Sequence, residues 1–549
     1  MSDAQQRPVA EKVPAGQSGP VQVSTLPYAQ TGYFSKLVCD YLDGNPSLLE
    51  LAAFTPNLQG LAKALDSLDN QPYDRDLLVR ELRAQYAEVH KEPAVLENIQ
   101  ALGQGAHAVV TAHQLNLFGG PLYLIYKTVS AIALARRLER EFPTRRIVPV
   151  FWLGSEDHDF AEIDHFRLFN RTIRWERAAG GSAGSLDLAG MDQVYAELDT
   201  LLGQGAHADS LRDLFRQAYL QTDTLANGQR RLLHALFGQY GLVVLDGDTP
   251  AFKRQFAPIM ARELSAQFSA RATVPALAVL EKEWHVQAPP RPLNLFYRTP
   301  GERIRLDWAQ EQLHLADTGQ TWTVEEALEK LDAHPEQFSP NVILRPLHQQ
   351  MALPAVAFIG GGAEVAYWLE LKPVFEAAGV FMPVVLLRNS ALWVDEAGAK
   401  RLESLGLSPQ ALFEEEEALV RRWVHAHEPS DLTLDEERRQ AETLYLGLVE
   451  RVRGVDASLV GKVEADKAAL LSAIEKLEQR LVKAAKQRHE VELNQLRKVH
   501  ARFFPDRGLQ ERTENFSTIW LRHGSAFIEA LLQGFDPLLP EFTVFSEER

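Results

Sequence analysis

The chain has 549 residues, of which 46% are hydrophobic, and its formal net charge at pH 7 is −17. Its length favours two or three domains, and its apolar content is enough for each of them to bury a core. The negative charge argues against sequence-independent binding of nucleic acid or anionic lipid, because both require an excess of Lys and Arg on the contacting face.

Membrane insertion and thiol chemistry are also disfavoured. No apolar run approaches the roughly 20 residues that a membrane-spanning helix needs, and the N-terminus lacks the basic and then apolar pattern of a secretory signal. We therefore expect a cytoplasmic protein that does not enter the membrane. The single cysteine, Cys39, has no partner for a disulfide or a thiolate metal site, so we expect it to serve as a small apolar side chain.

The N-terminal region divides into two parts. Residues 1–26 are polar, contain Pro and Gly and show no periodicity, which predicts disorder. From Tyr28 to about Gln104, apolar residues recur at helical spacing, as in "LLVRELRAQYAEV". This spacing predicts a series of helices that leads into the next region.

Two complete βαβ units follow. In the first, "AHAVVTAHQ" predicts a strand, "LNLFGG" a loop, and Pro121 the start of a helix that runs to the strand "RIVPVFWLG". In the second, the strand "LPAVAFI" precedes the triple glycine 360–362, a helix, and the strand "VFMPVVLLR". Between the two units, "YGLVVLDGD" predicts a further strand, followed by Thr249 as the N-cap of a helix.

Strands that alternate with helices predict the α/β fold class, here a Rossmann-like, doubly wound parallel sheet within a core domain at 27–390. Two stretches with strand-like alternation, "FRLFNRTIRWERA" and "LNLFYRTPGERIRLDW", predict small β insertions at about 160–190 and 280–335. Such insertions commonly flank the cleft of the core, and a purely structural role for most of their residues is an equally open alternative.

A charge-rich, helical arm is predicted at 391–500, and residues 501–549 are expected to return to the core. Apolar residues repeat at intervals of four and three, as in a coiled coil: Leu470, Ile474, Leu477, Leu481 and Ala484. The glycines of this arm, Gly447, Gly454 and Gly461, predict a break or turn. Two arrangements remain open, an antiparallel hairpin within one chain and a dimer formed through the arm.

Ionisable side chains gather where the predicted strands end. Ligands of open α/β sheets bind outside the carboxyl ends of the strands, so we expect four loops to meet at one cleft. The loops carry His113 and Gln114; Glu156, Asp157, His158 and Asp159; Asp246 and Asp248; and Gly360, Gly361 and Gly362. The closing segment "FFPDRGLQERTENF" could also reach this cleft through Arg507, Gln510, Glu511 and Arg512.

Each of these loops also has a simpler interpretation. The acidic residues at 156–159 could cap the segment that follows them, because carboxylates accept hydrogen bonds from the free N–H groups of a helix start. The triple glycine could form a structural turn rather than bind an anion at a helix N-terminus. No HExxH or other fixed ligand spacing occurs, so we expect no metal held by the protein alone.

Four long segments carry a resemblance to a known family. The sequence resembles the BshC family of bacillithiol biosynthesis, the cysteine-adding enzymes, in "VVTAHQLNLFGGPLYLIYKTVSAIALARRL", "VPVFWLGSEDHDFAEIDHF", "LRPLHQQMALPAVAFIGGGAEVAYWLELKPVFEAAGVFMPVVLLRNS" and "FFPDRGLQERTENF". The resemblance implies a Rossmann-like core, a coiled-coil arm that promotes homodimer formation, and a ligase that forms a carbon–nitrogen amide bond between cysteine and glucosaminyl-malate. Such a reaction needs an activated carboxylate, which implies ATP with Mg²⁺ and either an acyl-adenylate or an acyl-phosphate.

The resemblance also implies roles for individual residues. Those expected to bind nucleotide or substrate are His113, Gln114, Asn116, Gly119, Gly120, Tyr123, Arg345, Gly360, Gly361, Gly362, Glu364 and Trp368. Glu156, Asp157, His158 and Asp159 form the expected catalytic cluster, in which Asp157 or His158 acts as general base for the attacking amine.

Two other functions remain open from the sequence. The cluster at 156–165 could serve a metal-dependent hydrolase, or the chain could be a non-catalytic nucleotide-binding protein that acts through its coiled coil. The first predicts a tightly held divalent ion, and the second predicts no thiol phenotype on deletion.

Overall fold

A computed structural model describes residues 21–178, 180–428 and 432–548. Two compact units make up this part of the chain. The first unit contains the residues up to Leu392 together with Gly508–Phe545. The second unit contains Trp393–Arg507. Among the helices of the described residues, none combines the length and the apolar composition that crossing a bilayer requires.

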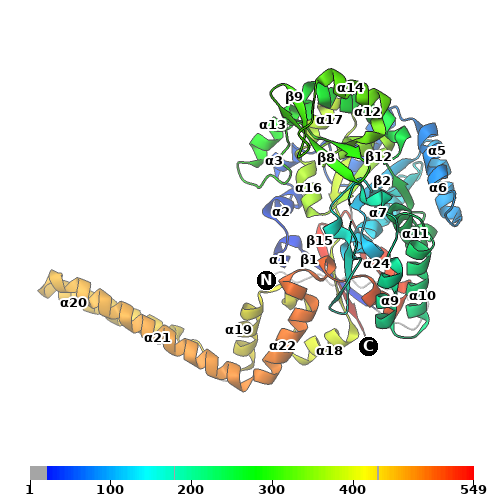
Figure 1. Cartoon of the computed structure of the whole chain (residues 1–549). Helices are drawn as coiled ribbons and strands as arrows, with labels where there is room; N and C mark the ends of the chain where they lie inside the picture. The colour runs from blue at the N-terminus through cyan, green and yellow to red at the C-terminus, as the bar shows by residue number, and fades with distance from the viewer. Residues whose placement is uncertain (1–20, 179, 429–431, 549) are drawn as a thin grey trace. The chain divides into compact units, whose positions relative to one another are not determined.

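A five-stranded parallel sheet forms the centre of the first unit (Figure 1). In spatial order its strands are β13 (Val384–Leu387), β12 (Ala355–Gly360), β2 (His107–Gln114), β3 (Ile147–Gly154) and β6 (Val243–Asp246). All five were predicted from apolar runs, because a strand covered on both faces is apolar throughout. The predicted Rossmann-like α/β fold is confirmed.

Helices cover both faces of this sheet. On one face, α4 (Leu58–Leu68) and α7 (Leu122–Glu141) pack against β2, β12 and β13, and the core there includes Leu61, Leu65, Ala131, Leu134, Val109, Val356 and Val384. Near the other edge, α5 (Arg75–Gln85), α6 (Pro93–Gly103) and α11 (Leu225–Phe237) contact β6. The helix α12 (Pro250–Ala266) begins as predicted, with the Thr249 hydroxyl accepting from the backbone N–H of Phe252.

The predicted β insertions are present. The first contains the hairpin of β4 (His165–Leu168) and β5 (Arg171–Arg174). The second contains the sheet β10-β9-β8-β7-β11, made of Thr321–Trp322, Gln312–Leu315, Glu302–Ala309, Leu295–Thr299 and Phe338–Pro340, together with the helix α14 (Val324–Ala333).

The remaining helices of the first unit are short or peripheral. They are α1 (Tyr28–Thr31), α2 (Lys36–Leu42), α3 (Pro46–Leu49), α8 (Phe160–Ile163), α9 (Met191–Leu202), α10 (Ala206–Phe215), α13 (Phe268–Leu280), α15 (Arg345–Ala352), α16 (Gly362–Trp368), α17 (Lys372–Ala378), α23 (Ser517–His523) and α24 (Ala526–Gly534).

One prediction for the N-terminus is wrong. Residues 21–26, expected to be disordered, belong to the strand β1 (Val21–Pro27), which pairs with β15 (Glu541–Glu547) in a sheet that also holds β14 (Ala391–Val394). The pairing partner lies at the other end of the sequence, so no local periodicity could indicate it. Residues 1–20 of the same prediction lie outside the described part of the chain.

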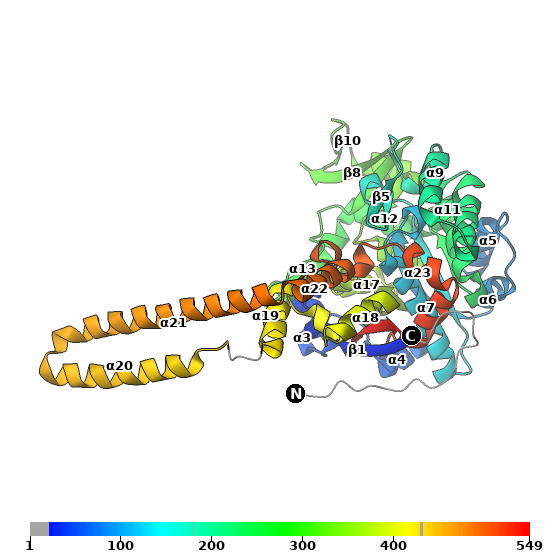
Figure 2. The ribbon, with the colours of Figure 1, turned by 90° about the horizontal axis from the view of Figure 1, so that it is seen from below.

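The second unit is helical. It contains α18 (Glu396–Ser404), α19 (Glu416–His427), α20 (Asp435–Val455), α21 (Val460–Arg488) and α22 (Glu490–Phe503). Helices α20 and α21 run side by side as an antiparallel hairpin (Figures 1 and 2), and an ion pair of 3.1 Å joins Arg438 to Glu478 across them. The chain turns at 456–459, so Gly454 and Gly461 flank the turn, whereas Gly447 lies inside α20 and marks no break.

Candidate functional site

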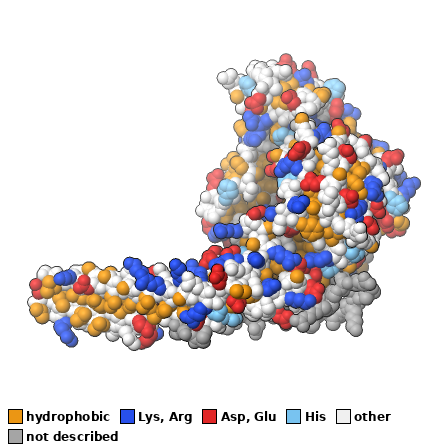
Figure 3. Space-filling model, turned by 60° about the horizontal axis from the view of Figure 1, so that its bottom comes forward, with side chains coloured by type: hydrophobic (Ala, Val, Ile, Leu, Met, Phe, Trp, Pro, Cys, Tyr) orange, Lys and Arg blue, Asp and Glu red, His pale blue; other side chains and the backbone are white. Residues whose placement is uncertain are grey.

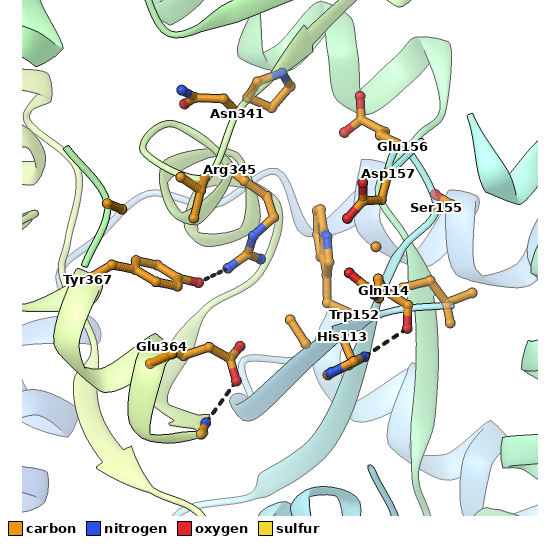
Figure 4. A pocket seen from close by; sticks show the side chains of 18 of the residues that line it. His113, Gln114, Trp152, Ser155, Glu156, Asp157, Asn341, Arg345, Glu364 and Tyr367 are labelled. Carbon is orange, nitrogen blue, oxygen red and sulfur yellow. Dashed lines mark hydrogen bonds between the residues drawn. The ribbon is translucent and has the colours of Figure 1, made fainter. Parts of the chain in front are cut away.

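A cavity of about 620 Å³ lies in the first unit at the carboxyl ends of β2, β3 and β12 (Figure 4). The register of the sheet produces this position, since Gln114 pairs with Gly154 and the two strands end level with each other. At Gly154 a Cβ atom would lie 2.9 Å from the carbonyl oxygen of His113, so only glycine fits beside β2. The strand ends therefore place two loops against one opening.

Nine of the residues predicted for nucleotide, substrate or catalysis line this cavity. They are His113, Gln114, Tyr123, Glu156, Asp157, Arg345, Gly361, Gly362 and Glu364. Figure 4 shows Glu156 and Asp157 on one wall, with Gln114 and His113 below them in this view, and Arg345, Tyr367 and Glu364 on the opposite wall. Of the closing segment, Arg512 also lines the cavity.

The other predicted residues do not line it. His158 and Asp159 are exposed, and the His158 ring contacts Phe296 and Arg303, two residues that do line the cavity. Trp368 is buried and stacks on Phe358, because its helix turns that side toward the core. The remaining predicted residues outside the lining are Asn116, Gly119, Gly120 and Gly360, of which Asn116 lies 3.0 Å from the ring of His113.

Asp157 presents a carboxylate to the cavity. One of its oxygens, Oδ1, accepts from the backbone N–H groups of His158, at 2.7 Å, and Asp159, at 3.3 Å. These bonds orient the side chain, and Oδ2 has no hydrogen-bond partner within the described residues. Asp157 therefore offers an oriented acceptor for a proton or a cationic group.

Glu156 is held differently from its neighbour. Its carboxylate pairs with Lys253, whose side chain is fully buried, and Lys253 also lies 3.8 Å from Asp248. Burial alone would raise the pKa of Glu156, but Lys253 and the nearby His348 and Arg303 hold it below its ordinary value. Glu156 thus remains a charged anchor of the wall, which suits a general base less well than Asp157.

Asp248 completes this buried group of charges. It pairs with Arg298, and burial together with the charge of Glu156 raises the pKa of Asp248 above its ordinary value. Two carboxylates thus share the cations Lys253 and Arg298. This network fixes the loop after β3 to the loop after β6.

The opposite wall carries Arg345, a cationic group without a carboxylate partner within the described residues. The guanidinium of Arg345 donates to Gln349 Oε1, at 2.9 Å, and to the Tyr367 hydroxyl, at 3.2 Å, and no described carboxylate lies within 4 Å of it. The same lack of a carboxylate partner applies, within the described residues, to Arg291, Arg303 and Arg512, which also line the cavity. Four such groups in a protein of charge −17 favour an anionic ligand.

An ion pair between Lys127 and Glu364 borders this wall. Lys127 donates to Glu364 and to the carbonyl oxygen of Ala112. Burial would raise the pKa of Glu364, but Lys127 and His113 hold it below its ordinary value, so the carboxylate stays charged. Glu364 Oε2 also accepts from the N–H of Gly361 at 2.8 Å, so that part of the predicted anion-binding loop is already occupied by the chain itself.

His113 lies at the base of the cavity. Its Nδ1 is 3.0 Å from the carbonyl oxygen of Gln114 and 3.0 Å from Nδ2 of Asn116. Burial, reinforced by the charge of Lys127, lowers the pKa of His113 to about 4. The ring is therefore neutral near pH 7 and can serve as a hydrogen-bonding group for a ligand.

The sequence analysis did not identify several of these residues. Arg303 comes from an insertion strand, Arg388 follows β13, and Lys253 lies inside α12, so none belongs to a recognisable motif. A partial signal was available for Arg388, since it ends a predicted strand in the same way as Gln114. Within the described residues, no group of three or more His, Cys, Asp or Glu side chains is placed to hold a metal ion.

Comparisons with known proteins cover nearly the whole chain. Residues 21–389 match the family model "Bacillithiol biosynthesis BshC, N-terminal Rossmann-like domain", and residues 391–547 match "Bacillithiol biosynthesis BshC, C-terminal coiled-coil domain". A relative from Flavobacterium johnsoniae, named "Putative cysteine ligase BshC", is 36% identical over 95% of this chain and 99% of its own. Relatives of the same name from Flavobacterium psychrophilum and Bacillus cereus are 35% and 25% identical over 94% and 90% of this chain, and over 98% and 95% of their own lengths. Both halves of the chain match in order, which confirms the resemblance that four sequence segments predicted. The chain belongs to the BshC family of bacillithiol biosynthesis.

Proposed function

We propose that this protein is a ligase that attaches cysteine to glucosaminyl-malate through an amide bond, which completes bacillithiol. Family membership and the printed name of the relatives support the reaction class. The observation that carries the proposal is the arrangement of charge in the cavity, where Asp157 stands opposite Arg345, one of four lining arginines that lack carboxylate partners within the described residues.

The charges of the cavity match the chemistry of these substrates. Glucosaminyl-malate carries two carboxylates, an amine and sugar hydroxyls, and cysteine carries a further carboxylate. Arg345 and Arg512 would hold carboxylates, because a guanidinium can bind one through two parallel hydrogen bonds. Asp157 would accept the amine, first by hydrogen bonding and then as the base that takes its proton.

Amide formation from a free carboxylate is uphill in water, so we propose activation of cysteine by ATP. ATP would convert the carboxylate to an acyl-adenylate with release of pyrophosphate, or to an acyl-phosphate with release of ADP. The amine then forms the carbon–nitrogen bond, AMP or phosphate leaves, and the proton of the amine passes to Asp157. His113 would contact the nucleotide, and Mg²⁺ would accompany the phosphates. We place the reaction in the cytoplasm, where ATP and cysteine are available.

Thiol-labelled mass spectrometry of cells that lack this protein would test the proposal. Bacillithiol should disappear, glucosaminyl-malate should accumulate, and the native chain supplied in trans should restore the thiol. Unchanged bacillithiol would refute the proposal and would favour a nucleotide-binding protein that acts without catalysis. The measurement needs no assumption about the nucleotide or about a further protein partner.

We also propose that a second copy of the chain pairs with the arm. The hairpin leaves apolar residues uncovered along its length: Leu444, Leu446, Val455, Leu459, Leu470 and Leu477 are 37–85% exposed. Figure 3 shows hydrophobic side chains gathered along the arm. Two of them, Leu470 and Leu477, belong to the predicted coiled-coil seam, which the hairpin itself does not bury. A surface of this kind favours a partner helix.

Sedimentation velocity would test the homodimer. We expect the native chain to sediment as a dimer and the double variant Leu470→Glu with Leu477→Glu to sediment as a monomer, because buried like charges oppose association. Glu475→Ala, at an exposed position of the same helix, serves as the matched control and should stay dimeric. A native monomer at all concentrations, or a dimeric double variant, would contradict this proposal.

A further inference from the structure

A second cavity, of about 630 Å³, lies in the first unit apart from the cavity described above. It is bounded by the end of α5, the segment that leads into α11, and the end of β6. Its lining consists of Ala84, Gln85, Glu88, Val89, Gln221, Thr222, Asp223, Asn227, Arg230, Arg231, Asp246 and Thr249. The volume is in the range of pockets that hold small metabolites, and no role assigned above uses this place.

Arg230 is the unusual group in this cavity. Its side chain is 3% exposed, and no described carboxylate lies within 4 Å of its guanidinium. Two of its nitrogens donate to neutral amide oxygens, Asn227 Oδ1 at 2.6 Å and Gln85 Oε1 at 3.2 Å. The third, Nε, has no partner within the described residues. A buried guanidinium is normally paired with an anion, and burial here lowers the pKa of Arg230.

Arg231 adds a second cation to the same cavity. Its guanidinium donates to the backbone carbonyl oxygens of Gln221, at 2.8 Å, and Glu88, at 3.2 Å, and it too has no described carboxylate within 4 Å. These backbone contacts hold Arg231 beside the opening without neutralising it. Two adjacent arginines without ion pairs are unexpected in a chain of charge −17.

Three carboxylates also line the cavity, and within the described residues none of them lies within 4 Å of either guanidinium. Asp223 accepts from Nδ2 of Asn227 at 2.8 Å. Asp246 accepts from the Ser155 hydroxyl and from the backbone N–H of Asp248, the latter at 2.9 Å, and its charge, acting from a distance, opposes the lowering of the pKa of Arg230 by burial. Glu88 is exposed at the rim. Arg230 therefore has carboxylates nearby but no anion in direct contact.

We propose that this second cavity binds a small anionic metabolite. Its carboxylate or phosphate group would pair with the guanidinium of Arg230, and Arg231 would contact the same group from the opening. An anion there would supply the contact ion pair that Arg230 lacks within the described residues, and an acceptor for Nε. Gln85 links this position to the first cavity: its amide exchanges hydrogen bonds of 2.8 and 2.9 Å with the backbone of Asp246, which in turn holds Ser155.

Anion soaks of crystals of the full chain would test the site. Selenate stands in for a phosphate and is located by its anomalous signal, and malonate stands in for a carboxylate. We expect density for one of the two beside Arg230 in the native protein and in Ala87→Trp, an exposed neighbour that does not line the cavity. The density should be absent in Ala84→Trp, which fills the cavity from an exposed rim position without altering the buried network.

Arg230→Met removes the charge directly, but the loss of a buried side chain could unfold the chain. Ala84→Trp tests the site without that risk, because it fills the cavity and leaves the buried residues unchanged. The anion that appears in the crystals is then used in titration calorimetry. Both tryptophan variants carry Arg345→Ala as well, which weakens binding in the first cavity. We expect Ala84→Trp to bind the anion at least tenfold more weakly than Ala87→Trp. Selenate density identifies the phosphate class, and malonate density the carboxylate class. The proposal is overturned if neither anion appears at Arg230 while anions fill the cavity at Arg345, or if Ala84→Trp binds as well as Ala87→Trp.

Discussion

Replacing Glu511 with alanine is expected to lower the free energy of unfolding of the first unit by about 3–5 kcal/mol, the typical cost of removing one partner of a buried ion pair. The Glu511 side chain is 0% exposed, and its two oxygens accept from Arg388 at 2.6 and 3.1 Å. A further bond of 3.1 Å comes from the backbone N–H of Ala391. The variant would leave the buried guanidinium of Arg388 without its counter-charge.

Urea unfolding followed by tryptophan fluorescence would measure this loss. Glu141→Ala is the matched control, because it removes a glutamate that also pairs with an arginine, Arg137, but with side chains 37% and 35% exposed. Exposed pairs of this kind contribute about 0–1 kcal/mol. If Glu511→Ala cost no more than Glu141→Ala, the buried pair of Glu511 and Arg388 would not stabilise the first unit more than an exposed pair does.

The sequence was sufficient for the sheet because each of its strands is covered on both faces. Runs such as "VVLL" at Val384–Leu387 are apolar without interruption, and the glycines and prolines that bound them mark the loops. The strand β1 escaped prediction because it pairs with β15, whose sequence lies some five hundred residues away. Local pattern carries no information about such a partner.

The candidate site was predicted only as far as strand ends could indicate it. His113, Gln114, Glu156 and Asp157 follow β2 and β3, so topology alone brought them to one edge. Sequence could not separate neighbouring residues of one loop: Asp157 lines the cavity, whereas His158 is exposed and does not.

The arginines of the cavity were predicted only in part. Arg345 was expected from the family resemblance and Arg512 from the closing segment, whereas Arg291 and Arg303 were not identified. Scattered arginines have no spacing that distinguishes them from arginines of the surface. Only the fold shows that these four share a cavity and lack carboxylate partners within the described residues.

Asp157→Asn is expected to lower the rate of ligation by about 10²–10⁴-fold, which is the usual contribution of a general base. The amide has nearly the size of the carboxylate, and its oxygen can keep both backbone hydrogen bonds from His158 and Asp159. What it cannot do is accept the proton that the amine of glucosaminyl-malate loses as the bond forms. The loss should therefore appear in kcat rather than in KM.

Asp159→Asn is the matched control, because Asp159 lies in the same loop and carries the same charge but is exposed and does not line the cavity. Its rate should stay within a few-fold of the native rate, and so should that of His158→Ala. Product formation from cysteine, glucosaminyl-malate and ATP, followed by mass spectrometry, measures all three. A near-native rate for Asp157→Asn would remove Asp157 from the mechanism, and equal losses at Asp157 and Asp159 would show that the charge of the loop, rather than one oriented carboxylate, assists the reaction.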